Sequence, residues 1–362
     1  MRTHLIFLAV LLMPLVACQS QQEQAETPEQ PVEVPEEKPD EEPVAPPEEP
    51  TVIDWETTAA FPVGHIEAQS IVLDGQLYVF GGYTDASVIP KSFAANVYDP
   101  QAETWTKLPD SPRPMTHTGV TSVDRTIYFA GGVVGSSDPD TLDKISAIRE
   151  VWSYNVDTQE WNALPPLPEP RGAGELVALG NELHFFGGTT LDREESVSDH
   201  WILSLADLED GADLESSDLW TPSAPLPKPR NHLGSTALGG KIYAIGGQTG
   251  HNEGLETQPY VHVWDPAAPD TWKQAASLPY GLGHVSGSTV ALGGLIYVIG
   301  GEIERFKYSD DVLVYDPDAD TWAFATSLPE KRHSASAGAI GDKLIVTGGG
   351  DFATQSFQGA IE

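Results

Sequence analysis

Cysteine and basic residues are scarce in this 362-residue sequence. The only cysteine, Cys18, excludes an intramolecular disulfide and a cysteine-rich zinc site. Lysine and arginine number 19 against 54 aspartates and glutamates, so the formal net charge at pH 7 is -35. Because such a charge repels phosphate backbones, we expect no nucleic-acid partner. The apolar run from Leu5 to Leu12 is too short to span a bilayer as a helix.

The N-terminal residues resemble an export signal. Arg2 precedes the apolar run, and the Leu-Val-Ala-Cys sequence ending at Cys18 resembles the bacterial lipobox, whose cysteine is lipidated and becomes the new N-terminus. The resemblance implies a lipoprotein signal peptide over residues 1–17 and contact with a membrane through the lipid anchor alone. Gln19, in place of Asp, resembles the sorting signal for the outer membrane. We therefore expect a lipid-anchored cell-envelope protein, at the outer membrane or in the periplasm or at the cell surface. The alternative is an ordinary secretory signal with an incidental cysteine.

Residues 18–51 are predicted to be the lipidated cysteine followed by a disordered tether. Between residues 19 and 50 there are eleven acidic residues and one lysine, Lys38, with proline recurring every few residues. Such a segment buries too little apolar surface to offset its loss of conformational entropy, and proline and charge repulsion extend it. We expect it to hold the folded part away from the membrane. An acidic interaction tail is the alternative.

The rest of the chain is repetitive, and its 34 glycines and 30 prolines favour short strands and turns. Glycine pairs follow strand-like apolar runs at Gly81, Gly131, Gly187, Gly246, Gly300 and Gly348, so they recur at nearly even intervals. A period of roughly 50 residues with such pairs is the signature of kelch repeats, and the chain therefore resembles the kelch β-propeller family. Third-strand tyrosines or tryptophans and fourth-strand tryptophans recur as well, and we expect these aromatic residues to form the core.

The spacing of the tryptophans predicts how the ring closes. Four of the five fourth-strand tryptophans lie at one fixed distance before the next glycine pair, namely Trp105, Trp161, Trp220 and Trp322. Trp55 lies at the same distance before Gly81, so it marks a fourth strand that has no blade of its own. The sequence ends too soon after Gly348 to reach a further fourth strand. We predict an all-β, six-bladed propeller over residues 52–362 with four antiparallel strands per blade. The N-terminal strand completes the C-terminal blade.

Polar residues open the innermost strands at positions where a hydrophobic core does not require them. The candidate ligand-binding residues are Arg113, His117, Arg171, Glu175, Arg230, His232, His284, Arg332 and His333. In one interpretation each residue hydrogen-bonds nearby backbone, and their recurrence in most blades favours this. In the other, several converge at the channel mouth on an anionic or sugar-like ligand. Arg171 with Glu175 departs from the pattern and is the best candidate for a ligand-binding or acid–base pair.

The loops after the second strands hold further candidates. These are Gln248, His251, Asn252 and Glu253 in the fourth repeat, and Glu194, Glu195, Asp199 and His200 in the third. The Glu195-x-x-x-Asp199 spacing is similar to the iron-binding motif of plant kelch specifier proteins, but residue 203 is leucine where that motif has histidine. We expect neither a metal nor another cofactor, and no catalytic residue is identified.

Two functions are compatible with these features. The chain resembles the exported sialic-acid epimerases of the kelch family in fold and compartment, which implies a carbohydrate-active enzyme of epimerase or mutarotase type. Its channel mouth would use Arg171, Glu175, Arg230 and His284. A site of the copper galactose oxidase type is excluded, because its Cys–Tyr crosslink has only Cys18 to draw on. The tether and the lack of a catalytic constellation favour a membrane-tethered module that binds an unknown protein or glycan through its loop face and channel mouth.

Overall fold

The structure is a computed structural model, and it describes residues 51–85, 92–135, 145–208 and 212–362. All of these residues belong to one compact unit. The predicted signal peptide, Cys18 and the predicted tether up to residue 50 lie outside the described residues. Within the described part, no helix has both the length and the hydropathy needed to cross a bilayer.

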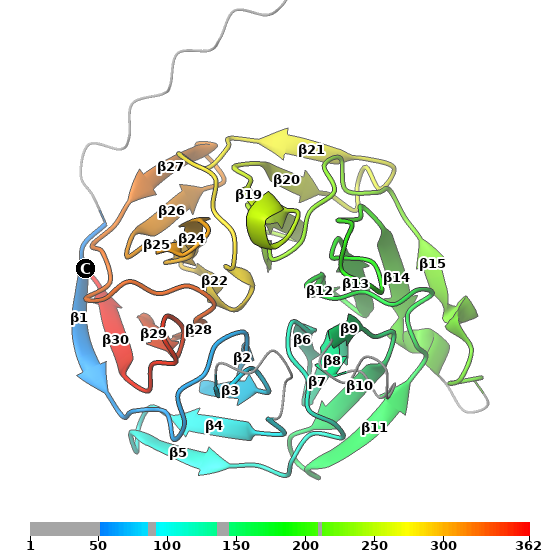
Figure 1. The fold of residues 1–362 in the computed structure, drawn as a ribbon, viewed down its shortest axis with the longest axis horizontal. Coiled ribbons are helices and arrows are strands. Elements are labelled where there is room, and N and C mark those ends of the chain that lie inside the picture. Colours follow the sequence, from blue (N-terminus) through cyan, green and yellow to red (C-terminus); the bar gives the residue numbers. More distant parts are fainter. Residues whose placement is uncertain (1–50, 86–91, 136–144, 209–211) are drawn as a thin grey trace, which may run out of the picture. The chain divides into compact units, whose positions relative to one another are not determined.

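Six antiparallel four-stranded sheets surround a common centre as the blades of a β-propeller, in agreement with the predicted fold (Figure 1). From the innermost strand outward they are β2(Gln69–Leu73), β3(Gln76–Phe80), β4(Ala95–Asp99), β5(Thr104–Lys107); β6(Gly119–Val123), β7(Thr126–Ala130), β10(Val151–Asn155), β11(Glu160–Leu164); β12(Glu175–Leu179), β13(Glu182–Phe186), β14(His200–Ser204), β15(Trp220–Pro222); β16(Gly234–Leu238), β17(Lys241–Ile245), β20(Val261–Trp264), β21(Trp272–Ala275); β22(Thr289–Leu292), β23(Leu295–Ile299), β26(Val312–Asp316), β27(Thr321–Phe324); and β28(Ser336–Ile340), β29(Lys343–Thr347), β30(Ser356–Ile361), β1(Ile53–Thr58). The innermost strands contact one another in this order around the ring.

Short elements lie in the connections between strands. Three two-stranded hairpins follow second strands, namely β8(Val133–Gly135) with β9(Ile145–Ala147), β18(Gln248–Thr249) with β19(Glu256–Thr257), and β24(Glu302–Glu304) with β25(Lys307–Tyr308). The 3₁₀ turns are η2(Leu205–Leu208), η3(Ser217–Leu219), η4(Asn252–Gly254) and η5(Ser286–Ser288). The turn η5 lies just before β22, within the one tryptophan-to-glycine spacing that is longer than the others, and accommodates that insertion.

The predicted closing strand is confirmed. β1 pairs with β30 along its whole length, from Ile53 opposite Ile361 to Thr58 opposite Ser356. β30 in turn pairs with β29, so the C-terminal blade takes its outermost strand from the other end of the propeller. Figure 1 shows β1 in blue beside β30 in red. The pairing covers an edge that would otherwise expose unpaired backbone groups.

Outer-strand tryptophans attach most of the blades to the blade before them. The indole Nε1 of Trp105 donates to the carbonyl of Ala59 at 3.0 Å, and that of Trp322 donates to Ala276 at 2.8 Å. Trp55 makes the equivalent contact across the closure, because its Nε1 donates to the carbonyl of Thr326 at 3.1 Å. Trp220 and Trp272 repeat this contact with the carbonyls of Pro165 and Ala224, both at 2.9 Å. The buried Nε1 of Trp161 has no hydrogen-bond partner within the part of the chain that the structure describes.

The glycine pairs allow each blade to approach the next. Gly246 adopts a φ of +59°, and a Cβ there would lie 2.4 Å from the carbonyl oxygen of Leu282 in the following blade. Gly247 donates its amide to the same oxygen at 2.8 Å. A side chain at either position would break this contact, which explains why glycine recurs there.

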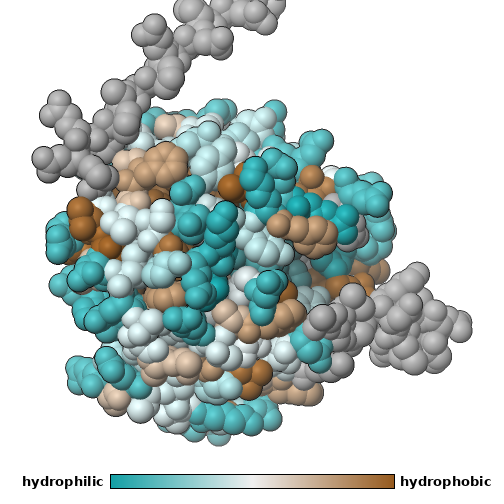
Figure 2. All heavy atoms as spheres, turned by 60° about the vertical axis from the view of Figure 1, so that its left-hand side comes forward, coloured by the Kyte–Doolittle hydropathy of each residue, from teal (hydrophilic) through white to brown (hydrophobic). Residues whose placement is uncertain are grey.

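The hydrophobic core lies between neighbouring blades. One cluster joins Tyr297 and Val314 of the fifth blade to Leu344 and Ile53 of the closing blade. Among the described residues, the solvent-facing surface has no comparable hydrophobic cluster on the side shown in Figure 2. On the side that carries β1 and β30, hydrophobic residues are scattered among hydrophilic ones (Figure 2). The blades therefore hold together through stacked inner faces, as expected for a repeat that cannot bury both of its faces alone.

Candidate functional site

Six equivalent residues form a ring where the chain enters the innermost strands. They share a left-handed backbone, with φ between +50° and +55°, and are Glu67, His117, Ala173, His232, His284 and Ser334. Each belongs to a different blade, and in five blades it lies two positions before the innermost strand. Backbone hydrogen bonds join neighbours, as from Ala173 to His117 at 2.9 Å and from Ser334 to His284 at 3.0 Å. Non-glycine residues rarely adopt this conformation, and such strain is often retained at functional sites.

The ring residues border a cavity of about 340 Å³, which we call the loop-face cavity. Its lining includes the ring residues Glu67, His117, His232 and His284, and His333 at the entry to the innermost strand of the closing blade. Residues from the loops after the second strands complete it, among them Tyr83, Arg193, Gln248, His251, Glu302, Arg305, Phe306, Tyr308 and Phe352. All six blades contribute to this wall. Residues from all six blades thus meet at one mouth of the channel.

His284 lies between two carboxylates at the base of this cavity. Its Nε2 is 3.3 Å from Glu67 Oε1, and its Nδ1 is 2.9 Å from Glu302 Oε2. Burial lowers the pKa of His284, but Glu67 and Glu302 outweigh burial and leave this pKa raised. The pKa of Glu302 is lowered, because its contact with His284 and the amide of Phe306 outweigh the raising effect of burial.

The histidines around His284 are held neutral. Burial lowers the pKa of His117 and His232 well below the usual value, and the positive charges of Arg193 and His284 lower both further. Burial likewise lowers the pKa of His333 to about 4, and its ring stacks on Tyr308 with centroids 3.8 Å apart. Neutral imidazoles offer free lone pairs as hydrogen-bond acceptors or as metal ligands.

None of the four predicted arginines lines the loop-face cavity. Arg171 binds Asp199 through Nε at 2.9 Å, and Arg113 pairs with Glu150. Arg332 binds Glu330 at 2.7 Å. These three arginines thus pair with carboxylates, whereas the structural interpretation of the sequence expected hydrogen bonds to nearby backbone.

Arg230 is the most deeply buried of the predicted arginines. It is fully buried and donates to the backbone carbonyls of Gly246, Lys228 and Ala244 at 2.6, 3.1 and 3.0 Å. Burial lowers its pKa to about 9. The guanidinium therefore joins the entry of one blade to its own second strand.

Glu175 lies in a different cavity from the histidines. This channel cavity, of about 330 Å³, is lined by the innermost strands of all six blades, beyond the ring residues. Ser235 Oγ donates to Glu175 Oε2 at 2.6 Å, and burial raises the pKa of Glu175 to about 7. The predicted pair with Arg171 does not form, because the arginine is engaged by Asp199. Of the four residues predicted to act together, only His284 lines the loop-face cavity.

Two of the predicted loop residues line the loop-face cavity, and the other described ones do not. Gln248 and His251 line the loop-face cavity, Glu253 is exposed, and the side chain of Asn252 lies outside the described part. In the third blade, Glu194 and Glu195 are exposed and Asp199 binds Arg171. His200 is buried, with its Nε2 3.0 Å from His184 Nδ1.

Glu67, Glu302 and Phe306 were not among the residues singled out in the sequence. Glu67 precedes Gly81 by the same spacing that separates His117 from Gly131 and His232 from Gly246. Counting back from the glycine pairs would have found it. Glu302 follows a glycine pair directly, but nothing in its neighbours distinguishes it from other loop acids.

Comparison with known proteins yields repeat proteins of one kind. Residues 117–349 match the family profile described as "KLHDC2/KLHL20/DRC7 Kelch-repeats domain", and residues 67–112 match the Kelch motif. Kelch-like protein terF of Aspergillus terreus is 29% identical over 267 residues, which are 73% of this chain and 55% of that protein. Kelch repeat-containing protein At3g27220 of Arabidopsis thaliana is 24% identical over 82% of this chain and 71% of its own length. Kelch-like protein 35 of Mus musculus is 26% identical over 76% of this chain and 42% of its own length.

The chain thus spans between 42% and 71% of the length of these relatives. Among solved structures, the structure of YjhT superposes with a TM-score of 0.59 at 20% identity, over 75% of this chain and 88% of that one. A likeness at this level of identity supports the fold alone.

Proposed function

Because this chain belongs to the kelch-repeat family of β-propellers, we propose that it is a protein-binding module whose partner docks on the loop face, over the loop-face cavity. The observation that carries the proposal is an exposed aromatic residue at the rim of this cavity. The hairpin of β24 and β25 presents Phe306 there with 72% of its surface exposed. The guanidinium of Arg305 lies over the Phe306 ring, 4.6 Å from its centroid.

An exposed aromatic ring beside a concave surface is suited to anchor a partner. Aromatic residues, phenylalanine among them, and arginine are enriched in protein–protein interfaces relative to the rest of the surface. The amide of Phe306 donates to Glu302 Oε1 at 2.6 Å, so the tip of the hairpin is attached to the cavity wall. A partner side chain that enters the cavity would therefore contact Phe306 at the rim.

Substitution of Phe306 by alanine is expected to lower partner affinity by about 2 kcal/mol, a loss typical of an interface anchor. The full chain would carry a photo-crosslinking phenylalanine analogue at position 306, and the protein crosslinked in an envelope extract would be identified and purified. Affinities of the wild type and of Phe306→Ala for that protein would then be measured by calorimetry.

Phe324→Ala is the matched control, because Phe324 is also an exposed phenylalanine but lies on the outer strand β27. A partner crosslinked equally at positions 306 and 324, or an affinity that Phe306→Ala leaves unchanged, would contradict the proposal. A glycan array probed with the full chain tests whether the ligand is a glycan and not a protein. Glycan binding that Phe306→Ala abolishes would assign the same face to a carbohydrate.

We also propose that the propeller is anchored to the cell envelope through a lipid on Cys18. The proposal is supported by the lipobox-like sequence and by the acidic, proline-rich segment that follows it. The arrangement would present the loop face at a distance from the membrane. No observation favours the sugar epimerase alternative, since its predicted residues do not meet in one cavity.

The Cys18→Ser variant is expected to lose incorporation of labelled palmitate in a bacterial host and to move from the detergent phase to the aqueous phase on Triton X-114 partitioning. Acyl chains contribute membrane affinity in proportion to the methylenes they bury, so removing their attachment site releases the chain. Ser20→Ala serves as the control and should behave as the wild type. Label retained by Cys18→Ser would show that the cysteine is not the lipidation site.

A further inference from the structure

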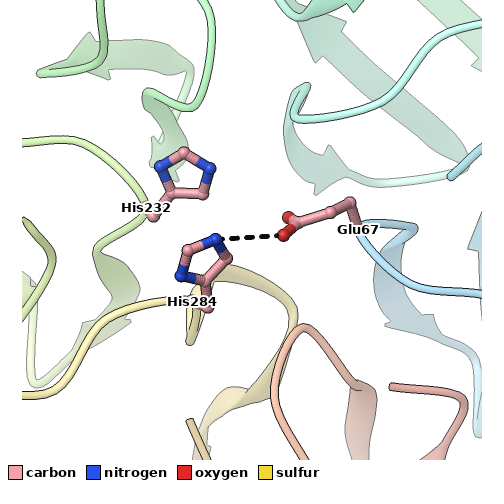
Figure 3. Close-up of side chains that lie close together, drawn as sticks. All are labelled: Glu67, His232 and His284. Carbon is pink, nitrogen blue, oxygen red and sulfur yellow. Dashed lines mark ion pairs between the residues drawn. The ribbon is translucent and has the colours of Figure 1, made fainter. Parts of the chain in front are cut away.

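Three side chains from three blades converge at the base of the loop-face cavity. Glu67, His232 and His284 each place one ligand-type atom within 4.8 Å of the others (Figure 3). Among the described residues, these three form the cluster of histidine and acidic side chains whose atoms lie close enough together to hold one metal ion. Glu67 comes from the first blade and the histidines from the fourth and fifth, so the cluster is assembled across the channel. All three are ring residues with a left-handed backbone.

Both histidines have one ring nitrogen oriented by a neighbouring acceptor. His284 Nδ1 faces Glu302 Oε2 at 2.9 Å. His232 Nδ1 contacts Asn231 Oδ1, and Asn231 Nδ2 donates to Ser196 Oγ at 2.7 Å, which sets the orientation of the amide. A tautomer with the proton on Nδ1 fits both contacts, and each Nε2 is then left for another contact. Histidines that bind metals have this arrangement, in which an outer carboxylate or carbonyl fixes the tautomer and the ring.

The distances suit a metal ion with few adjustments. His284 Nε2 and Glu67 Oε1 are 3.3 Å apart, and ligands about 2.0–2.1 Å from a tetrahedral zinc are separated by about 3.4 Å. The widest separation in the cluster, up to 4.8 Å, reaches that value when the two atoms approach each other by about 1.4 Å in total, which small side-chain rotations can supply. Ser334 Oγ donates to Glu67 Oε1 at 2.5 Å and so orients the carboxylate as well.

We propose that Glu67, His232 and His284 form a binding site for one divalent transition-metal ion of the zinc type. Two imidazoles and one carboxylate are a common ligand set for catalytic zinc and for ferrous iron, and they leave a coordination position open. The three side chains line the loop-face cavity, so a ligand entering that cavity reaches the open position. A carboxylate or other anionic group would fit it. The proposal departs from the expectation, drawn from the sequence, that the chain binds no metal. Its ligands are ring residues and not the loop residues of the third blade.

The alternative occupant of the cluster is a proton. His284 carries a positive charge between Glu67 and Glu302 when both ring nitrogens are protonated, and this ion-pair network needs no metal. The two possibilities differ in a measurable way, because only the first gives stoichiometric binding that depends on all three ligands.

The test measures Zn²⁺ binding by the full chain after dialysis against a chelator. The wild type is expected to bind one equivalent with submicromolar affinity in calorimetry, and Co²⁺ in its place should give visible absorption bands of tetrahedral type. Glu67→Gln and His284→Gln should each lower the affinity by at least about 100-fold, more than the loss typical of an outer-shell change. His251→Gln, a histidine of the same cavity outside the cluster, should remain within about threefold of the wild type.

The N-terminal acidic segment is present in every variant, so any metal that it binds cancels in the comparison. Thermal melting shows which variants are folded. If His284→Gln fails to fold, the Zn²⁺ affinity of Glu67→Gln and the Co²⁺ spectrum of the wild type decide whether the metal site exists. The proposal is overturned if the wild type binds no stoichiometric Zn²⁺, or if a folded Glu67→Gln binds it as tightly. Partner binding through Phe306 does not enter these measurements, so the metal site and the proposed function succeed or fail separately.

Discussion

Replacement of Ile53 by aspartate should destabilise the whole propeller. Ile53 is 2% exposed and packs with buried residues of the fifth and sixth blades, although it is the first residue of β1. Loss of its apolar contacts together with burial of a charge is expected to lower the free energy of unfolding by more than about 4 kcal/mol. This is a large part of the total stability of a typical domain. Urea unfolding followed by tryptophan fluorescence measures the effect.

Val52→Asp provides a closely matched comparison, because Val52 is the preceding residue and is 46% exposed. We expect this variant to unfold within about 0.5 kcal/mol of the wild type, as surface substitutions usually do. Ile53→Ala, expected to lose about 2–4 kcal/mol, keeps the test informative if the aspartate variant does not fold. Equal midpoints for the variants at 52 and 53 would mean that β1 does not complete the closing blade.

The Glu175→Gln variant should remove a pH dependence of stability that the wild type possesses. Burial raises the pKa of Glu175 from 4.5 to about 7 in the folded protein, whereas the unfolded chain keeps the ordinary value. Below about pH 4.5 the carboxyl is protonated in both states, and its contribution is fully present. As the pH rises to about 7 only the unfolded state loses its proton, so the wild type should lose about 3 kcal/mol relative to the variant.

Glutamine keeps the size of the side chain and an oxygen that accepts from Ser235, so the variant isolates the charge. Unfolding free energies of both proteins would be measured in urea at pH 5, 6, 7 and 8. Glu160→Gln is the control, since Glu160 is exposed on the outer strand β11. A difference between wild type and Glu175→Gln that stays constant over this range would show that Glu175 is ionised throughout.

The proposals for the loop-face cavity concern different depths of one site. The ring residues Glu67, His232 and His284 lie at its base, and Phe306 lies at its rim. A partner that supplies a carboxylate to a metal at the base would also pass the aromatic ring at the rim. If both proposals hold, removal of the metal should weaken the partner without changing the surface that Phe306 contacts.

The sequence identified part of the candidate site. The distance of each predicted residue from the next glycine pair shows which residues belong to the site. Arg171, Arg230 and Arg332 share one spacing to the glycine pair that follows them, whereas His117 and His232 share another that is two positions shorter. The structure places the first set in the walls between blades and the second set in the ring. Both sets are polar residues near the start of an innermost strand, so residue type alone does not separate them.

The number of blades, the strand order and the closing strand could be determined from the amino-acid sequence. A repeat of constant length stacks on its neighbour through the same contacts each time, and Trp55 carries the spacing of a fourth strand. Only the tertiary structure decided that Glu67 meets His232 and His284. These residues are far apart in the chain: Glu67 belongs to the first blade, and the two histidines belong to the neighbouring fourth and fifth blades. Their meeting depends on the diameter of the closed ring and on a left-handed backbone at each position, neither of which a local sequence pattern specifies.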